Sequence, residues 1–182
     1  MVEAVRTSLG LDVSSSSTGW AVVDDRLTLL ECGLIAFKHG SQQRLGKRLN
    51  DFRIRLWDVL EKYKDVTYMV VEDTYMAKNV ATTKLLNKFS GVTIQLSEEI
   101  IPKASRGILA PQAIRSAIFP KQKSDKELVY QHMAKKYPQI VSFPGTTIAS
   151  GKHKGEIIND VTDAIAMACY PFLKKIPEGN LL

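Results

Sequence analysis

The amino-acid sequence predicts an α/β fold in which a mixed β-sheet is flanked by helices. Three strand-like stretches come first, and an amphipathic helix follows them. A short, almost wholly apolar run then precedes a second helix, which is typical of a buried strand with a parallel crossover. Ligands of such sheets bind at the carboxyl ends of the strands. We therefore expect the functional site at that edge.

Size and composition indicate one folded domain, which we expect to span residues 1–182. The chain is 45% hydrophobic and 24% charged, which argues against disorder. Its net charge of +6 favours a polyanionic partner such as nucleic acid. Cys32 and Cys169 match no zinc spacing, and no stretch approaches the roughly 20 apolar residues that span a membrane. Reduced thiols and a cytoplasmic location are the expectation.

The first half of the chain alternates apolar and polar residues as an antiparallel meander does. A serine run and an Asp-Asp-Arg turn separate its strands, and a helix with apolar residues at helical spacing follows, with Ser41 as a candidate cap. We expect strands over 5–13, 18–24 and 27–37, a helix over 41–64 and a buried strand over 66–73.

The second half is helical with one strand. Residues 138–155 are rich in Gly, Pro and Ser and are the best candidate for a mobile loop. We expect helices over 79–100, 111–119, 125–136 and 156–173, and a strand near 104–109.

Four acids stand where these elements place functional groups. Asp12 ends the first strand and Glu72 ends the fourth. If these strands are neighbours, both carboxylates lie at the same edge of the sheet. Asp160 and Asp163 are three apart on the last helix and share a face. Grouped carboxylates repel unless a cation neutralises them, and oxygen ligands favour Mg²⁺ or Mn²⁺. Two such ions would suit phosphodiester hydrolysis by a basic protein.

Each acid also has an ordinary explanation. Asp12 could form an Asx turn, and Asp160 or Asp163 could be solvated helix positions. Glu72 is harder to explain in this way, because an acid directly after an apolar run is costly when buried without a partner. Taken together, the four acids favour a site.

Three segments carry a family resemblance: "LGLDVSSSSTGWAVV", "VVEDTYMAKNVATTKLLNKFSGV" and "NDVTDAIAMA". In this order they resemble the RuvC-like Holliday-junction resolvases, which have the ribonuclease H-like fold. The resemblance implies a mixed five-stranded sheet and an endodeoxyribonuclease that acts as a homodimer. Such an enzyme nicks a four-way DNA junction symmetrically with two divalent metal ions, Mg²⁺ or in its place Mn²⁺.

The resemblance also assigns roles to residues. The metal-binding acids would be Asp12, Glu72, Asp160 and Asp163, the same four residues that the pattern selects. Tyr75 would stack on opened junction bases, although a half-buried loop tyrosine is the alternative. Arg115 and Lys126 fall in a segment that binds and cleaves DNA, with Lys126 able to neutralise developing charge; both could instead be solvated. Phosphate contacts are expected from Lys78, Lys84 and Lys88.

The chain departs from the family at three places. Ser14 stands where glycine is common, and Arg115 where lysine is usual, which exchanges a point charge for a guanidinium fork. The stretch from Phe143, Pro144 and Gly145 to Gly155 has no counterpart that we can align, and the role of His153 within it stays open. Whether Ser14 to Ser17 touch DNA or only shape the turn also stays open.

Other functions compete with junction resolution. A nucleotide-binding protein of the actin-like or sugar-kinase class also places an Asp after its first strand, but such proteins usually duplicate the fold. A ribonuclease H-type or flap-cutting nuclease would use the same acids on other branched DNA or on RNA–DNA hybrids. A non-catalytic junction-binding protein is disfavoured, because all four acids are present.

Overall fold

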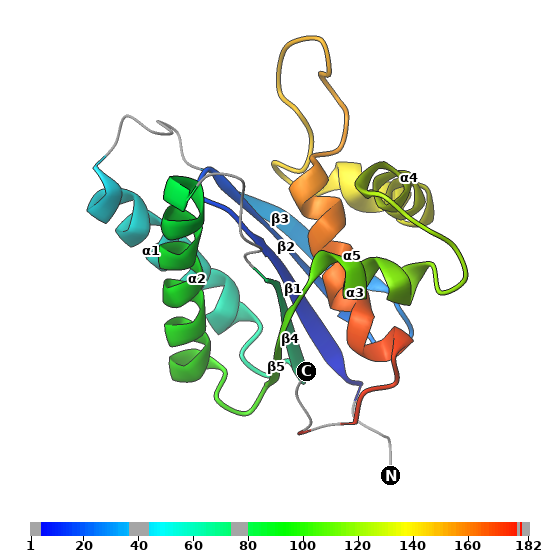
Figure 1. Ribbon diagram of the computed structural model, residues 1–182, viewed down its shortest axis with the longest axis horizontal. Coiled ribbons are helices and arrows are strands. Elements are labelled where there is room, and N and C mark those ends of the chain that lie inside the picture. The colour runs from blue at the N-terminus through cyan, green and yellow to red at the C-terminus, as the bar shows by residue number, and fades with distance from the viewer. Residues whose placement is uncertain (1–4, 37–43, 74–79, 178, 180–182) are drawn as a thin grey trace.

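The computed structural model describes residues 5–36, 44–73, 80–177 and 179. Figure 1 shows three layers, with α1 and α2 on one face of a central sheet and α3, α4 and α5 on the other. The elements are β1 (Thr7–Val13), β2 (Ser17–Asp24), β3 (Leu29–Ala36), α1 (Leu45–Lys62), β4 (Tyr68–Glu72), α2 (Val80–Ile100), β5 (Ser105–Leu109), α3 (Pro111–Ile118), α4 (Lys126–Lys136), the 3₁₀ helix η2 (Pro138–Ser142) and α5 (Asn159–Leu173).

The sheet is mixed and five-stranded, with the order β3-β2-β1-β4-β5. Strands β1, β2 and β3 form an antiparallel meander, whereas β4 runs parallel to both β1 and β5. This arrangement confirms the mixed sheet expected from the sequence. Because β1 and β4 are parallel neighbours, their carboxyl ends lie at the same edge.

The face covered by α1 and α2 is filled by large side chains. Leu9 and Leu11 of β1 point to this side and meet the apolar faces of both helices. Phe52 of α1 and Phe89 of α2 are fully buried between them, with ring centroids 5.3 Å apart. Interdigitated side chains of this kind form an ordinary close-packed core.

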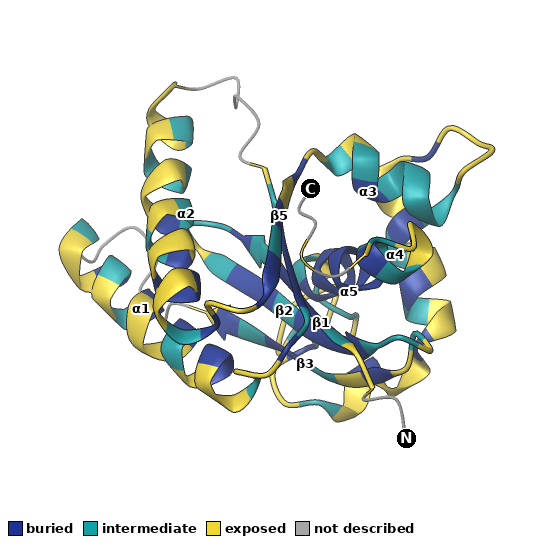
Figure 2. Cartoon of the chain, turned by 90° about the horizontal axis from the view of Figure 1, so that it is seen from below, coloured by how far each residue is buried: buried dark blue, intermediate teal, exposed yellow. Residues whose placement is uncertain are grey.

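The opposite face is packed much more closely, because glycines let α5 approach the strands. A Cβ atom on Gly10 would lie 2.0 Å from the carbonyl oxygen of Ala164, and one on Gly19 would lie 1.9 Å from that of Asp160. Figure 2 shows α5 dark blue between the sheet and the outer helices, in contrast to the exposed outer sides of α1 and α2.

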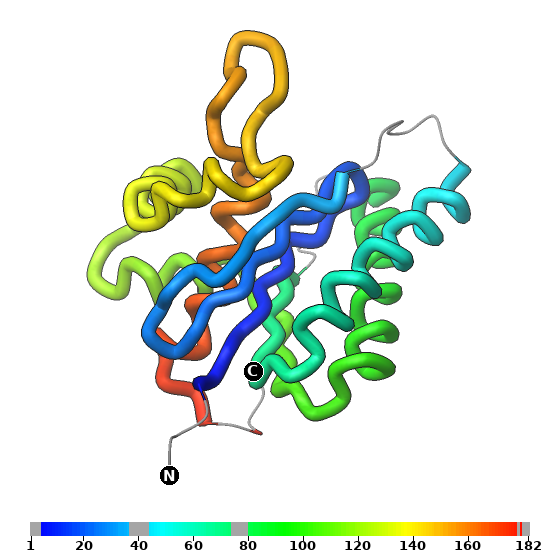
Figure 3. Tube along the Cα trace, turned by 180° about the vertical axis from the view of Figure 1, so that it is seen from behind, coloured from blue at the N-terminus to red at the C-terminus, as the bar shows by residue number. Residues whose placement is uncertain are grey.

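The bounds of the expected elements agree with the structure to within a few residues, with two exceptions. Helix α1 begins at Leu45 with Arg44 as its N-cap residue, and Ser41, the candidate cap, lies outside the described residues. Residues 138–155, the candidate mobile loop, contain η2 and a hairpin-like turn that projects from the body of the molecule (Figure 3). None of the described helices is long and apolar enough to cross a membrane.

Candidate active site

Strand geometry places the first two acids side by side. Side chains alternate along a strand, so Asp12 shares a face with Gly10, and Glu72 shares one with Val70. Gly10 contacts α5 and Val70 belongs to the core beneath α5. Asp12 and Glu72 therefore point to the α5 side of the sheet, at the edge where β1 and β4 both end.

Helix α5 adds the other two acids at the same edge. Asp160 lies in its first turn and Asp163 follows one turn later, with only 9% of Asp163 exposed. The contact of Gly19 with the backbone of Asp160 fixes the start of the helix against β2. The four predicted acids are thus gathered at one place from β1, β4 and α5.

The serine run supports this arrangement from the β1–β2 turn. The Ser17 hydroxyl donates a hydrogen bond to Asp160 Oδ2. The Ser14 hydroxyl shapes the turn, donating to the Ser17 carbonyl at 2.5 Å and accepting from the Ser17 amide at 3.1 Å. The guanidinium of buried Arg48, on α1, donates to the Ser15 carbonyl. Ser17 therefore orients an acid, and Ser14 and Arg48 hold the turn that carries Ser17.

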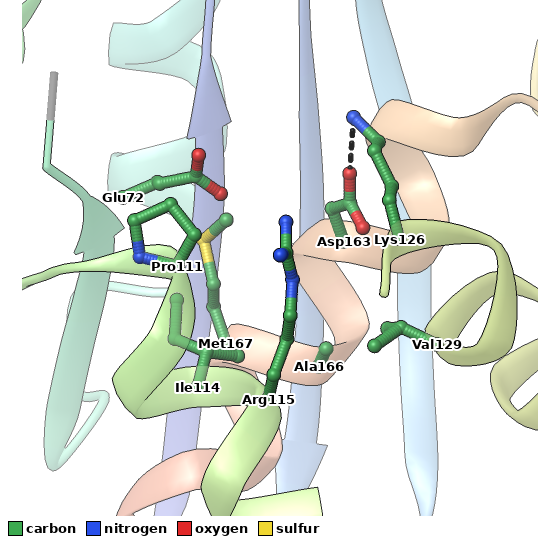
Figure 4. Close-up of a pocket in the computed structure, with 9 residues that line it drawn as sticks. All are labelled: Glu72, Pro111, Ile114, Arg115, Lys126, Val129, Asp163, Ala166 and Met167. Atoms are coloured by element: carbon green, nitrogen blue, oxygen red, sulfur yellow. Dashed lines mark ion pairs between the residues drawn. The ribbon is translucent and has the colours of Figure 1, made fainter. Parts of the chain in front are cut away.

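Two cations face the acids from α3 and α4. Lys126 Nζ lies 2.7 Å from Asp163 Oδ2. Figure 4 shows Arg115 reaching from α3 into the space between Glu72 and Asp163. These groups line a pocket of about 80 Å³. The pocket is lined by Glu72, Pro111, Ile114, Arg115, Lys126, Val129, Asp163, Ala166 and Met167.

The close grouping of the carboxylates shifts their pKa values. Burial raises the pKa of Asp12 well above its usual range, and the charges of Asp163, Glu72 and Asp160 raise it further. Burial likewise raises the pKa of Glu72 and of Asp163, in both cases against the opposing effect of Lys126. Burial disfavours the charged form of Lys126, but the neighbouring acids outweigh it and raise the pKa of the ammonium. The site therefore gathers more acidic than basic side chains in a partly buried space.

The donor set suits a hard cation, which prefers carboxylate oxygens. As the side chains stand in the described part of the chain, no three His, Cys, Asp or Glu groups are close enough together to hold a metal ion. Asp163 is turned to Lys126, and Asp160 to Ser17. Metal binding at this cluster would thus need the carboxylates to draw together, which the raised pKa of Asp12 indicates they resist without a cation.

The structure brings Arg115 and Lys126 to the acids, whereas Lys84 and Lys88 lie elsewhere. Lys84 and Lys88 are exposed on α2, across the sheet from α5. Tyr75 and Lys78 lie outside the described residues. His153 is exposed, with Nδ1 2.9 Å from Glu156 Oε1. Sequence reasoning did not identify Arg48 or the specific role of Ser17, because four consecutive serines carry no signal that separates one from another.

Known proteins are similar to this chain over most of its length. Residues 8–170 match the family described as crossover junction endodeoxyribonuclease RuvC. A protein of that name from Nitratidesulfovibrio vulgaris (strain Hildenborough) is 31% identical over 136 residues, which are 68% of this chain and 72% of the relative. One from Ruegeria pomeroyi is 27% identical over 166 residues, 90% of each protein.

Solved structures show the same fold. The RuvC of T. thermophilus in complex with a Holliday junction substrate superimposes with a TM-score of 0.68 at 16% identity, over 94% of this chain and 96% of that one. The yeast mitochondrial Holliday junction resolvase Ydc2 gives a TM-score of 0.56 at 12% identity, over 93% and 80%. The expected ribonuclease H-like fold is confirmed.

Proposed function

The chain belongs to the RuvC family of crossover junction endodeoxyribonucleases, and from this premise we propose that it resolves four-way DNA junctions by symmetric paired nicking. The observation that carries the proposal is the gathering of Asp12, Glu72, Asp160 and Asp163 at one edge of the sheet. Symmetric nicking needs two such sites, so the active form is a homodimer. In this proposal residues 1–182 form one nuclease domain.

Dependence on divalent metal is typical of this family, and the four acids are the proposed ligands. Two Mg²⁺ ions per site, or Mn²⁺ in their place, would activate water and stabilise the leaving oxygen. The partly buried carboxylate of Asp12 supports this assignment, because its ionised form needs a cation to offset desolvation and three neighbouring acids. Ser17 holds Asp160 in orientation by its hydrogen bond.

Lys126 and Arg115 have a second task in this proposal. In the described structure the Lys126 ammonium pairs with the Asp163 carboxylate. It thus supplies part of the positive charge that a metal ion would supply. If Asp163 held a metal ion, the Lys126 ammonium would be free to neutralise the negative charge that develops at the scissile phosphate. Arg115, beside Glu72 and Asp163, binds the phosphate through its guanidinium fork.

The wider DNA surface rests on residues away from the acids. Lys84 and Lys88, one turn apart and exposed on α2, are proposed to contact phosphates, as is Lys78. Tyr75 is proposed to stack on bases at the opened crossover, where stacking tolerates any sequence. Other branched DNA and RNA–DNA hybrids remain the alternative substrates, whereas family membership sets aside an actin-like or sugar-kinase activity.

One substrate comparison tests the proposal. Purified protein with Mg²⁺ is mixed with labelled four-way junctions, three-way junctions, flaps and RNA–DNA hybrids at equal concentration. We expect paired nicks in the four-way junction and little cutting of the others. Preferred cutting of flaps or hybrids would contradict junction resolution.

The variant Asp12→Asn tests whether the acids are needed for cleavage. It keeps the shape of the side chain but removes a charge, so it should bind the junction and lose cleavage by at least about 100-fold, the order of effect of removing one transition-state stabilising group. Cleavage at the wild-type rate would remove Asp12 from the metal site. Light scattering of the protein–junction complex tests the dimer, and one protomer per junction would count against it.

A further inference from the structure

A hairpin of residues 143–158 rises beside the active site between η2 and α5 (Figures 1 and 3). A β-bridge between Thr147 and Ile157 closes its base. Above the bridge, the amide of Ile148 donates to the Glu156 carbonyl and that of Gly155 to the Ile148 carbonyl, both at 2.9 Å. The segment therefore has a defined backbone, even though its sequence shows no strand or helix periodicity.

The root of this hairpin is fixed to the body of the protein. Thr146 is fully buried, and its hydroxyl lies 2.7 Å from the Ile140 carbonyl oxygen, to which it donates. Phe143, Ile157 and Ile158 pack against the core beneath α5. Ile158 is the N-cap residue of α5 and stands two positions before Asp160. The hairpin and the catalytic acids are thus anchored on the same rigid support.

The tip of the hairpin presents positive charge. Lys152 and Lys154 are exposed on either side of His153, in a turn where Gly151 and Gly155 both have φ of +89°. The acid that follows them in the sequence, Glu156, contacts His153. No ion pair within the described residues engages either lysine. Two ammonium groups are therefore free to bind an anion outside the protein.

We propose that the 143–158 hairpin is a DNA-binding arm, whose Lys152 and Lys154 hold phosphates of the junction arm that leads into the cut site. The inference rests on the proposed function and names a further binding surface for the same substrate. The tip stands about five residues beyond the bridge, which in extended chain is at most about 17 Å. One DNA strand advances about 3.4 Å per nucleotide, so the lysines reach phosphates up to about five nucleotides away.

Such contacts position DNA without reading its sequence. A lysine–phosphate contact releases a bound counterion, and each contact contributes about 0.9 to the slope of log affinity against log salt concentration. Two lysine contacts therefore account for about 1.8 of the slope. A change in this slope distinguishes the loss of direct phosphate contacts from an indirect effect on folding.

The test compares two double variants of the whole protein. Lys152→Gln with Lys154→Gln removes the charge at the tip, whereas Lys174→Gln with Lys175→Gln removes an equal charge from exposed lysines at the other end of α5. Binding to a labelled four-way junction is measured in chelator between 0.05 and 0.2 M salt. We expect the steepness of log affinity against log salt to fall by about 1.8 for the hairpin variant only. The ratio of wild-type affinity to hairpin-variant affinity should then be about twelvefold smaller at 0.2 M salt than at 0.05 M.

The outcomes are distinguishable from those of the proposed function. A wild-type protein that neither binds nor cuts four-way junctions overturns the proposed function itself. A wild type that cuts junctions, together with a hairpin variant whose slope equals that of wild type, overturns only the DNA-binding arm. An equal loss of slope in both double variants also overturns it, because the effect would then follow net charge rather than position. Thermal unfolding of both variants controls for folding.

Discussion

The two faces of the sheet are held together by different means. On the α1 and α2 side, large side chains such as Phe52 and Phe89 fill the space between helices and strands. On the α5 side, Gly10 and Gly19 bring the helix backbone directly onto β1 and β2. The first arrangement can adjust to a changed side chain, whereas the second leaves no room. Only the second face carries the acids, so the rigid packing lies where the proposed catalytic geometry depends on it.

The substitution Gly19→Ala should disrupt the packing of α5 against the sheet most severely. Its Cβ would meet the Asp160 carbonyl at 1.9 Å, so the start of α5 must shift. Overpacking of this kind costs about 1–3 kcal/mol. A displacement of about 1 Å at the acids lowers cleavage about 100-fold. Denaturant unfolding and junction cleavage by the folded protein measure the two effects.

Its matched control is Gly91→Ala on α2, where an added Cβ meets nothing within 4 Å. Replacing a glycine inside a helix by alanine stabilises by about 0.5–1 kcal/mol. A lower free energy of unfolding for Gly19→Ala and a higher one for Gly91→Ala would support the difference between the two faces. Equal stability changes at the two positions would refute it.

The change Leu60→Ala tests the other face. Leu60 of α1 is fully buried, and removing such a side chain costs about 2–5 kcal/mol. Because the cavity lies across the sheet from the acids, cleavage per folded molecule should stay at the wild-type level. The measurement is the cleavage rate at a temperature where unfolding curves show the variant folded. A large loss of rate there would mean that the two faces are mechanically coupled.

A smaller effect is expected from Ser17→Ala. The variant removes the hydroxyl that orients Asp160, and loss of a group that orients a metal ligand costs about 10–100-fold in metal affinity. Calorimetric titration with Mn²⁺ measures this independently of cleavage. Ser16→Ala is the control, because Ser16 is exposed and no described bond joins its hydroxyl to an acid. Similar Mn²⁺ affinities for both variants would remove the orienting role.

The smallest effect concerns pH without metal. Burial and neighbouring acids raise the pKa of Asp12, so the folded protein binds this proton more tightly than the unfolded chain. The free energy of unfolding should therefore fall as pH rises above about 4, the unfolded value. Asp12→Asn lacks this penalty and should gain a few degrees in Tm over wild type toward pH 7, at about 2–4 °C per kcal/mol. Scans in chelator from pH 4 to 7 measure it, and a constant difference would contradict the prediction.

Most of the fold was predictable because periodicity fixes local structure. The alternating strands, the apolar run before Glu72 and the helical spacing of the last segment all appear in the structure. The placement of Asp12 and Glu72 was predictable for a related reason: the carboxyl ends of neighbouring parallel strands lie at one edge of the sheet. Residues 143–158 lacked such a signal, since their shape depends on backbone bonds and on the buried hydroxyl of Thr146.

The partners of the acids could not be predicted, because they depend on distances across the fold. Nothing in the sequence distinguishes Ser17 from Ser16, yet only Ser17 shares the α5 face with Gly19. The ion pair of Lys126 with Asp163 likewise depends on how α4 lies against α5. The roles of the acids, Lys126 and the DNA-contact residues therefore stay predictions until the variants are tested.

The hydrogen bond between Ser17 and Asp160 joins residues that are 143 positions apart in the chain. Contacts of such long sequence separation form late, because the loop between them must first be closed at an entropic cost. During synthesis, β1, β2 and β4 leave the ribosome well before α5, and they carry only two of the four acids. A partly made or partly folded chain therefore holds an incomplete centre. With the acids in their proposed role, the last helix would make DNA cutting conditional on completed folding.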